Sequence, residues 1–404
     1  MSLTSRASAQ RALVVLGIVV LAFNLRPAAV SVGPILGEIR GGLGMTTAEA
    51  GVLTSLPVLA FAVFGALAPV GARLVGLHRL TLAALLCLVG GLAGRASVSS
   101  VPAFLGLSLL ALAGMASANV LLPSLVKLHF PDRVGTVTAV YSTALAAGIT
   151  VSSVLTVPIS EAAGGWRDGL AVWSLVAAVA VLPWLVLLRH DRGRVAPAPG
   201  ARIPLSAIAR TRTGRMMAGF FALQSVQAYA VFGWFAGIFR DAGYSATQAG
   251  LLLGVITGIS IPLSFVVPSL AGRLGDVTPI VLALVACFPI GYVGLALAPH
   301  DLAVVWALFI GVGTCTFPLV LVLIGLRSRT PEGTAALSAF TQSVGYLMAA
   351  VGPFAFGVLH DLTDGWTVPL LALTALVVPL TWCGLAIARP AHVEDELGLT
   401  APAS

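Results

Sequence analysis

The stretch FNLRPAAVSVGP, residues 23–34, places the permanently charged side chain of Arg26 inside an apolar run long enough to cross a membrane. An arginine at the centre of a membrane helix costs roughly 2.5–3.5 kcal/mol on insertion scales, and it cannot avoid this cost by losing its proton. All fifteen Asp and Glu residues fall in predicted loops or at the ends of predicted spans. We therefore expect the partner of Arg26 to be a small anion from outside the chain, since a planar group with five donors suits a carboxylate-like or pseudohalide anion.

Pro27 directly follows Arg26 and removes one helical hydrogen bond, so we expect the helix to bend here. A proline also disfavours helical angles at the residue before it, which would turn Arg26 out of the regular helix. The alternative role for Arg26 is structural, with its guanidinium donating to backbone carbonyls of a neighbouring helix or of the Phe23 region. Asn24 lies two residues from Arg26 and so on nearly the opposite face, where packing is its expected role.

Two glutamines lie on the seventh apolar run, where Gln224, Gln227 and Trp234 recur at helical spacing with Phe220 and Val231. The stripe predicts one wall of a substrate-binding site. The alternative is interhelical hydrogen bonding of the kind that joins many membrane helices. Polar side chains at comparable depth on other runs complete the candidate set: Asn119, Tyr141, Gln342 and Tyr346.

The composition is that of an all-α membrane protein. Of the 404 residues, 58% are hydrophobic and only 9% are charged, which leaves too little polar surface for a protein surrounded by water. Twelve apolar runs between Ala12 and Ala388 are each long enough to span a bilayer, and they lack the alternating polarity of barrel strands. The sequence therefore predicts twelve transmembrane helices.

The basic residues follow the sides of the membrane and do not form one patch, so the net charge of +7 does not indicate nucleic acid as a partner. Seventeen of the 22 Lys and Arg residues fall on predicted cytoplasmic segments when the N-terminus is placed inside. This asymmetry predicts that both termini are cytoplasmic in a multi-pass protein of the cell membrane. Apart from Arg26, the remaining basic residues are predicted to lie outside: Arg40, Arg95, Arg167 and Arg240.

One polar stretch, residues 189–215, divides the chain into two six-helix halves, 1–188 and 214–404, joined by a cytoplasmic linker at 189–213. The halves align at an offset of roughly 200 residues, since GMTTAEAGVL (44–53) matches GYSATQAGLL (243–252). Two pseudo-symmetric six-helix halves are the plan of a secondary transporter that rocks around a site at the middle of the membrane.

Several motifs carry a family resemblance: NLRPA in the first run, NVLLPSLVK with FPDRVG at the fourth, YST in the fifth, ALQSVQ in the seventh, and GY with VGP in the eleventh. With them the chain resembles the major facilitator superfamily and, within it, the cyanate and nitroimidazole porters. The resemblance implies the major facilitator fold and gating loops after the second and eighth spans. The first loop keeps Arg73 and Arg79 but lacks an acidic residue, whereas the second keeps Arg273 and Asp276.

Motifs of soluble enzymes are absent, including GxxxxGK[ST] for nucleotide phosphates and HExxH for zinc, so we expect no enzyme, no metal and no cofactor. The four cysteines sit in separate apolar runs and are expected to pack. The predicted function is alternating-access transport of a small anion or compact polar solute such as cyanate, nitrate, nitrite or a small organic anion, by a monomer in the lipid bilayer. The alternatives are efflux of nitroimidazole-like or other small aromatic compounds and, in another class, a membrane-embedded sensor.

Overall fold

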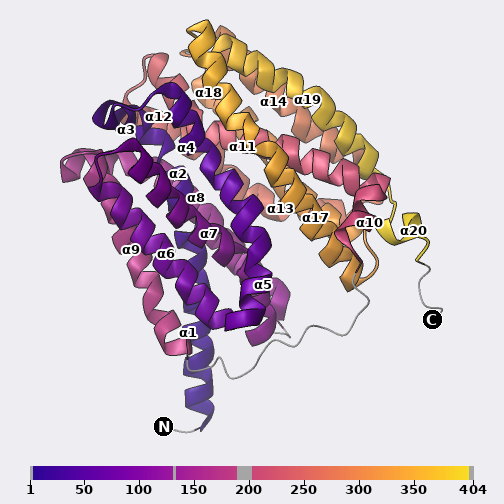
Figure 1. Ribbon diagram of the computed structural model, residues 1–404. Helices are drawn as coiled ribbons and strands as arrows, with labels where there is room; N and C mark the ends of the chain where they lie inside the picture. Colours follow the sequence, from indigo (N-terminus) through magenta and orange to yellow (C-terminus); the bar gives the residue numbers. More distant parts are fainter. Residues whose placement is uncertain (1–2, 131–132, 189–202, 400–404) are drawn as a thin grey trace. The chain divides into compact units, whose positions relative to one another are not determined.

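The computed structural model describes residues 3–130, 133–188 and 203–399, and every regular element within them is helical (Figure 1). The elements of the first half are α1 Leu3–Asn24, α2 Pro27–Val30, the 3-10 turn Gly33–Ile35, α3 Leu36–Leu43, α4 Thr47–Ala60, the π-helix Phe61–Gly65, α5 Ala66–Val75, α6 Leu77–Ser97, α7 Val101–His129, α8 Val134–Ala163 and α9 Trp166–Leu187. Those of the second half are α10 Leu205–Arg210, α11 Arg212–Asp241, α12 Ala246–Gly258, α13 Ser260–Arg273, α14 Thr278–Leu297, α15 Ala303–Thr314, α16 Thr316–Leu326, α17 Pro331–Ala349, α18 Val351–Thr363, α19 Thr367–Ala388 and α20 Val393–Glu396.

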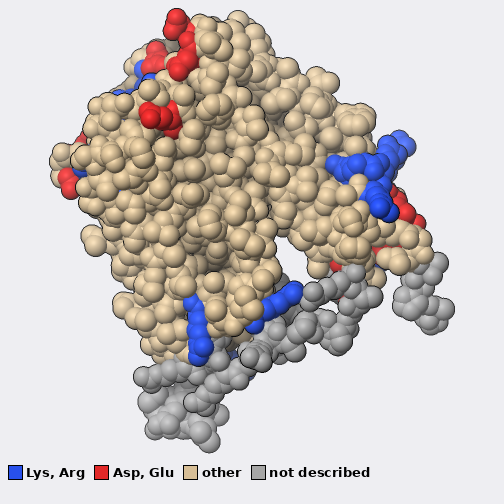
Figure 2. All heavy atoms as spheres, in the orientation of Figure 1, with Lys and Arg blue, Asp and Glu red and all other residues tan. Residues whose placement is uncertain are grey.

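Twelve spans in the described residues are long and apolar enough to cross a membrane, which confirms the predicted number. Many of them are interrupted helices, because prolines such as Pro27 remove a helical hydrogen bond inside the span. On the face drawn in Figure 2, the charged side chains gather in separate patches, and large areas of the surface between them carry none. Uncharged surface of this kind is what contact with the lipid chains of a bilayer requires.

The chain divides into two compact units. The first contains residues 1–197 together with 246–254, and the second contains residues 198–245 and 255–404. Residues 189–202 of the predicted linker lie outside the described residues. The rest of that stretch holds α10 and the start of α11, where Thr211 accepts a hydrogen bond from the backbone of Gly214 and so begins the helix.

In the first unit, α6 packs against both α7 and α9 (Figure 1). Its buried face carries Leu85, Leu88 and Leu92, none of which is exposed. The short helix α2 packs against α7 and α8. These contacts bring the break in the first span against two long helices of the same unit.

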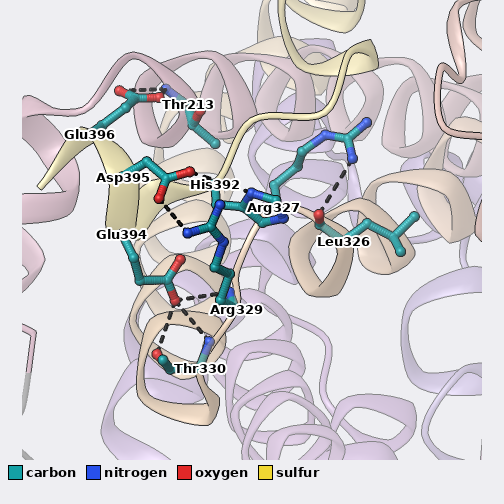
Figure 3. Close-up of polar contacts among 9 residues, drawn as sticks. All are labelled: Thr213, Leu326, Arg327, Arg329, Thr330, His392, Glu394, Asp395 and Glu396. Carbon is teal, nitrogen blue, oxygen red and sulfur yellow. Dashed lines mark hydrogen bonds and ion pairs between the residues drawn. The ribbon is translucent and has the colours of Figure 1, made fainter. Parts of the chain in front are cut away.

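In the second unit, the three acidic residues of α20 hold the ends of other helices, and we call Glu394, Asp395 and Glu396 the C-terminal clasp (Figure 3). Glu396 accepts hydrogen bonds from the backbone of Arg212 and Thr213 at the start of α11. A carboxylate at a helix N-terminus satisfies donors that have no partner within the helix.

Glu394 acts in the same way at the start of α17. One of its oxygens accepts from the backbone N–H groups of Arg329 and Thr330, both at 3.0 Å, and from the Thr330 hydroxyl at 2.9 Å. Asp395 pairs with the Arg329 guanidinium at 2.6 Å. The segment is tied further by the Val393 N–H, which donates to the Arg327 carbonyl. The clasp therefore joins the starts of α11 and α17 through one short segment.

Candidate substrate site

The first span breaks where the sequence predicts. Helix α1 ends at Asn24 and α2 begins at Pro27, and the Leu25 N–H donates to the Ala22 carbonyl at 3.3 Å in a tightened last turn. Arg26 nevertheless keeps right-handed helical angles, with φ −91° and ψ −35°, so the expectation that proline would drive it out of this region is wrong. The change of hydrogen-bond pattern alone interrupts the helix.

Helix α8 lies directly against this break. A Cβ atom added to Gly148 would lie 2.2 Å from the carbonyl oxygen of Phe23, the carbonyl that loses its helical donor because Pro27 has no N–H. Glycine is therefore required at position 148 for this approach. The contact fixes α8 beside the residues that immediately precede Arg26.

Arg26 lies near the middle of a 33-residue span, fifteen residues after its start at Arg11 (26 − 11) and seventeen before its end at Leu43 (43 − 26). Its Nε atom is buried, and within the described part of the chain the guanidinium forms no hydrogen bond and no ion pair. The structural alternative, donation to backbone carbonyls, has no contact to support it among these residues.

The contact that Arg26 does make is with an aromatic ring, since its Cζ atom lies 6.0 Å from the centroid of Phe61. Phe61 begins the π-helix that interrupts the second span four residues after Pro57. Turns of this kind are frequent at functional sites because they change the direction of side chains within a helix. A cation facing an aromatic ring at this distance is weakly attracted to it but is not neutralised.

Asn119 and Tyr141 come from α7 and α8, the two helices against which α2 packs. Asn119 is half-buried and makes no hydrogen bond within the described chain, yet its amide is not enclosed. Tyr141 is 9% exposed. Neither side chain forms a hydrogen bond with Arg26. Asn119 and Tyr141 therefore lie on helices that pack beside Arg26 but are not bonded to it.

In the second unit, Gln224 is buried and donates to the Phe221 carbonyl at 3.1 Å and to the Ser225 hydroxyl at 2.7 Å. Its Oε1 atom is buried without a donor in the described structure. A buried acceptor left without a partner costs free energy unless something else supplies the donor. Gln224 therefore keeps an unused acceptor that a polar solute could bind.

Gln227 is placed differently, because both of its polar atoms are bonded to neighbouring helices. Its Nε2 donates to the Leu373 carbonyl of α19 at 3.0 Å, and its Oε1 accepts from the Tyr292 hydroxyl of α14 at 2.8 Å. This is the interhelical role that the sequence left open for the amides. Its assignment to the substrate site stays a prediction, which these contacts do not support.

Trp234 is also bonded within its own unit, so its assignment to the site likewise stays a prediction without support from its contacts. Its indole N–H donates to the Pro353 carbonyl at 3.0 Å, and its ring lies against Phe356 and Trp366. The ring thus packs α11 against α18. It fills space between these helices and has no free donor.

The two candidates on α17 each contact a neighbouring side chain. Gln342 is half-buried and donates to the Ser338 hydroxyl at 2.8 Å within the same helix. Tyr346 is 5% exposed and packs edge-on against Phe221, with ring centroids 4.8 Å apart. Through Phe221, Tyr346 lies next to the carbonyl that holds Gln224.

The predicted gating residues Arg73, Arg79 and Arg273 are exposed at helix ends. Asp276 is exposed between α13 and α14, where it accepts from the Thr278 N–H at 2.8 Å and lies 3.9 Å from the Arg389 guanidinium. The hydrogen bonds from Thr278 hold the pKa of the Asp276 carboxyl below its ordinary value. Asp276 thus accepts the hydrogen bond of the first backbone N–H group of α14.

One charged residue is buried in a way that the sequence did not predict. Arg95, predicted on the outer side of the membrane, is in the last turn of α6 and is 0% exposed. The side of the membrane on which it lies stays a prediction. Its Nη1 donates to the Ala28 carbonyl at 3.0 Å and its Nη2 to the Ser31 hydroxyl at 3.3 Å. The signal that would have found it is the turn sequence SVSSVP, which begins two residues later and leaves Arg95 within the helix.

Three comparisons with known proteins agree with this architecture. The family model of the Major Facilitator Superfamily matches residues 13–353. The uncharacterized transporter YycB of Bacillus subtilis is 36% identical over 93% of this chain and 94% of its own length. The 2-nitroimidazole transporter of Escherichia coli is 33% identical over 96% and 99%, and the cyanate transport protein CynX of the same organism is 27% identical over 89% and 94%.

Among solved structures, the nucleoside transporter NupG covers 93% of this chain and 98% of its own, with a TM-score of 0.75 at 14% identity. At this identity the likeness concerns the fold alone. The span number, the matched family model and the relatives together lead to one conclusion: the chain is a multi-pass membrane transporter that belongs to the Major Facilitator Superfamily.

Proposed function

We propose that this transporter moves a small anion and that Arg26 is its anchor. The observation that carries the proposal is the guanidinium of Arg26, which lies near the middle of its span with no hydrogen bond or ion pair from the described residues. Among those residues, Asp and Glu lie at span ends or between spans, and Asp132 and Asp191 fall outside the described part. A charge in this position needs an anion from elsewhere.

The chemistry of the site favours a small, flat anion. A guanidinium offers parallel N–H donors that match two oxygens of one carboxylate or nitrate group. The ring of Phe61 beside it presents an apolar face to a planar solute. Asn119 and Tyr141, on the helices packed against α2, are proposed to contribute neutral donors and acceptors. A relative named for cyanate transport, 27% identical, supports the pseudohalide class.

A second candidate function is efflux of nitroimidazole-like aromatic compounds. It is favoured by the 33% identical 2-nitroimidazole transporter and by the aromatic ring of Phe61 next to Arg26. The two functions differ in their dependence on charge, because a neutral aromatic solute gains little from a formal positive charge. A substitution that removes the charge therefore separates them.

The test measures the melting temperature of the purified protein with sodium cyanate, nitrate, nitrite or formate at constant ionic strength, because a ligand that binds the folded state raises it. We expect a shift for the parent protein, a smaller shift for Arg26→Lys and none for Arg26→Gln. Arg167→Gln is the matched control, since Arg167 in the same half stacks on Trp166 at 4.4 Å.

Isotope exchange in liposomes completes the test and also separates a transporter from a sensor. Exchange of the bound anion should be lost in Arg26→Gln at matched reconstitution and retained in Arg167→Gln. Parent-like binding and exchange in Arg26→Gln would refute the anion anchor. A shift with 2-nitroimidazole that survives Arg26→Gln would instead support the aromatic substrate.

A further inference from the structure

Arg95 has a fully buried guanidinium, which donates hydrogen bonds to the short segment that directly follows Arg26. It lies on α6, and its two bonds reach Ala28 and Ser31, two and five residues after Arg26. The Ser31 hydroxyl in turn donates to the Pro27 carbonyl at 2.5 Å. A continuous chain of hydrogen bonds therefore runs from α6 to the first residue of α2.

The segment that Arg95 contacts is too short to be a stable helix without support from its neighbours. Helix α2 has four residues, about one turn, and a single turn fixes several dihedral angles for very few hydrogen bonds. Its position must come from contacts with neighbouring elements. Helix α6 is a suitable support because it is 21 residues long and packs against both α7 and α9.

Arg95 donates only to neutral acceptors, and not all of its donors have a partner. Its acceptors are a carbonyl and a hydroxyl, and its Nε atom is buried with no acceptor in the described structure. A fully buried cation with neutral partners is costly, so an uncharged side chain would serve simple packing at lower cost. What the two hydrogen bonds of Arg95 add beyond packing is a link between α6 and the segment of α2.

We propose that Arg95 is the positioning residue of the anion site: by tying α2 to α6, it fixes the backbone at Arg26 and hence the direction of the Arg26 guanidinium. This inference rests on the proposed function, in which Arg26 binds the anion. Loss of the tether should weaken binding because a charge-assisted pair depends on the alignment of its donors. It should do so without changing the residue that touches the anion.

The experiment measures the dissociation constants of sodium nitrate and sodium cyanate for the purified parent protein and for Arg95→Gln, Arg95→Lys and Arg26→Gln. Arg167→Gln again serves as the control. We expect the stronger-binding anion to lose about tenfold or more in affinity in Arg95→Gln, as for a lost charge-assisted contact. Arg95→Lys should restore part of the affinity, because it keeps a positive charge and a donating nitrogen at this position.

A double variant separates positioning from general damage. If Arg95 acts through Arg26, then Arg95→Gln should add nothing to the loss already caused by Arg26→Gln. A role in stability alone would lower the melting temperature while leaving the affinity of the folded protein unchanged. That result, or additive losses in the double variant, would overturn the proposal.

A readout without ligand follows the segment itself. A spin label on Ala29→Cys, in a background with the four native cysteines replaced by alanine, should become more mobile in Arg95→Gln and stay unchanged in Arg167→Gln. If Arg95→Gln does not fold, Ser31→Ala removes one acceptor and should give a smaller change of the same kind. Unchanged mobility and affinity in both variants would refute the tether.

The outcomes distinguish this inference from the proposed function. If Arg26→Gln loses anion binding while Arg95→Gln keeps it, the positioning role fails and the anion anchor stands. If Arg26→Gln binds nitrate and cyanate like the parent, the proposed function fails, and the positioning role fails with it.

Discussion

The hydrogen bonds of the C-terminal clasp predict how much stability the protein loses when Glu394 is replaced. In Glu394→Gln, the side chain keeps a carbonyl oxygen for the three donors of Arg329 and Thr330 but loses its charge (Figure 3). A hydrogen bond to a charged group contributes about 1.5–3 kcal/mol, roughly twice that of a neutral one. With donors sharing one oxygen, we expect a net loss of about 1–2 kcal/mol for this helix start.

The loss should depend on pH in a defined direction. Burial raises the pKa of Glu394, but the hydrogen bonds from Thr330 and Arg329 outweigh it, so that the pKa lies below its ordinary value. A carboxyl with a lowered folded-state pKa stabilises the protein above its unfolded-state pKa of about 4.3, and this contribution disappears as the pH falls through the folded-state value. Glu394→Gln has no carboxylate to titrate at this position.

The assay is thermal unfolding of the purified protein between pH 7 and the acid limit of solubility. At pH 7 we expect Glu394→Gln to melt about 2–8 °C below the parent, by the usual relation between free energy and melting temperature for a unit of this size. The two curves should converge as the pH drops. Glu332→Gln is the control, because Glu332 lies exposed in the first turn of the same helix.

A difference that persists unchanged at acid pH would show that the charge of Glu394 does not stabilise the start of α17. An equal effect of Glu332→Gln would show that general helix-dipole attraction, and not the three specific bonds, is responsible. Either result would refute the reasoning from the contacts.

Three further predictions concern Gln227, the glycine that lies against the break in the first span, and the dependence of transport on a pH gradient. Gln227→Leu should lower the melting temperature, since it leaves the Tyr292 hydroxyl without its acceptor at a cost of about 1–3 kcal/mol, but we expect its nitrate affinity to match that of the parent. Weakened affinity would instead support the predicted place of Gln227 in the site. Gly148→Val should force α8 away from the Phe23 carbonyl and abolish anion exchange, measured as flux at matched expression. Gly90→Val is the control and should keep exchange, because a Cβ atom at Gly90 would meet nothing within 4 Å. Anion exchange should continue when the pH gradient is collapsed, because no described Asp or Glu lies near mid-span; strict loss of exchange would require a titrating carrier.

Much of the fold could be predicted because its determinants are local. Span number follows from the length of apolar runs, and the break before Pro27 follows from a missing N–H group. The backbone angles at Arg26 were predicted wrongly, since the preference of a residue before proline is weaker than the hydrogen bonds that its carbonyl accepts from Ala29 and Val30. Local rules therefore located the break but did not give its geometry.

The hydrogen-bond partners of the polar residues on α11 could not be predicted from the sequence. Periodicity placed Gln224, Gln227 and Trp234 on one face of a helix, but α11 is buried on nearly all sides, so a shared face did not mean a shared neighbour. Gln227 meets Tyr292, which is 65 residues away in the sequence. Such contacts depend on packing between spans, and a single sequence does not contain the packing angles.

The contrast between Arg95 and Arg26 gives the strongest argument for the candidate site. Both guanidinium groups belong to apolar spans of the same unit, and both would be costly without partners. The fold supplies Arg95 with a carbonyl and a hydroxyl, so acceptors can be provided to a buried arginine in this region. Arg26 receives none from the described residues, although the Phe23 carbonyl near it has lost its helical donor. The fold thus gives Arg95 two acceptors and gives Arg26 none among the described residues, which supports our proposal that Arg26 is the arginine available to an anion.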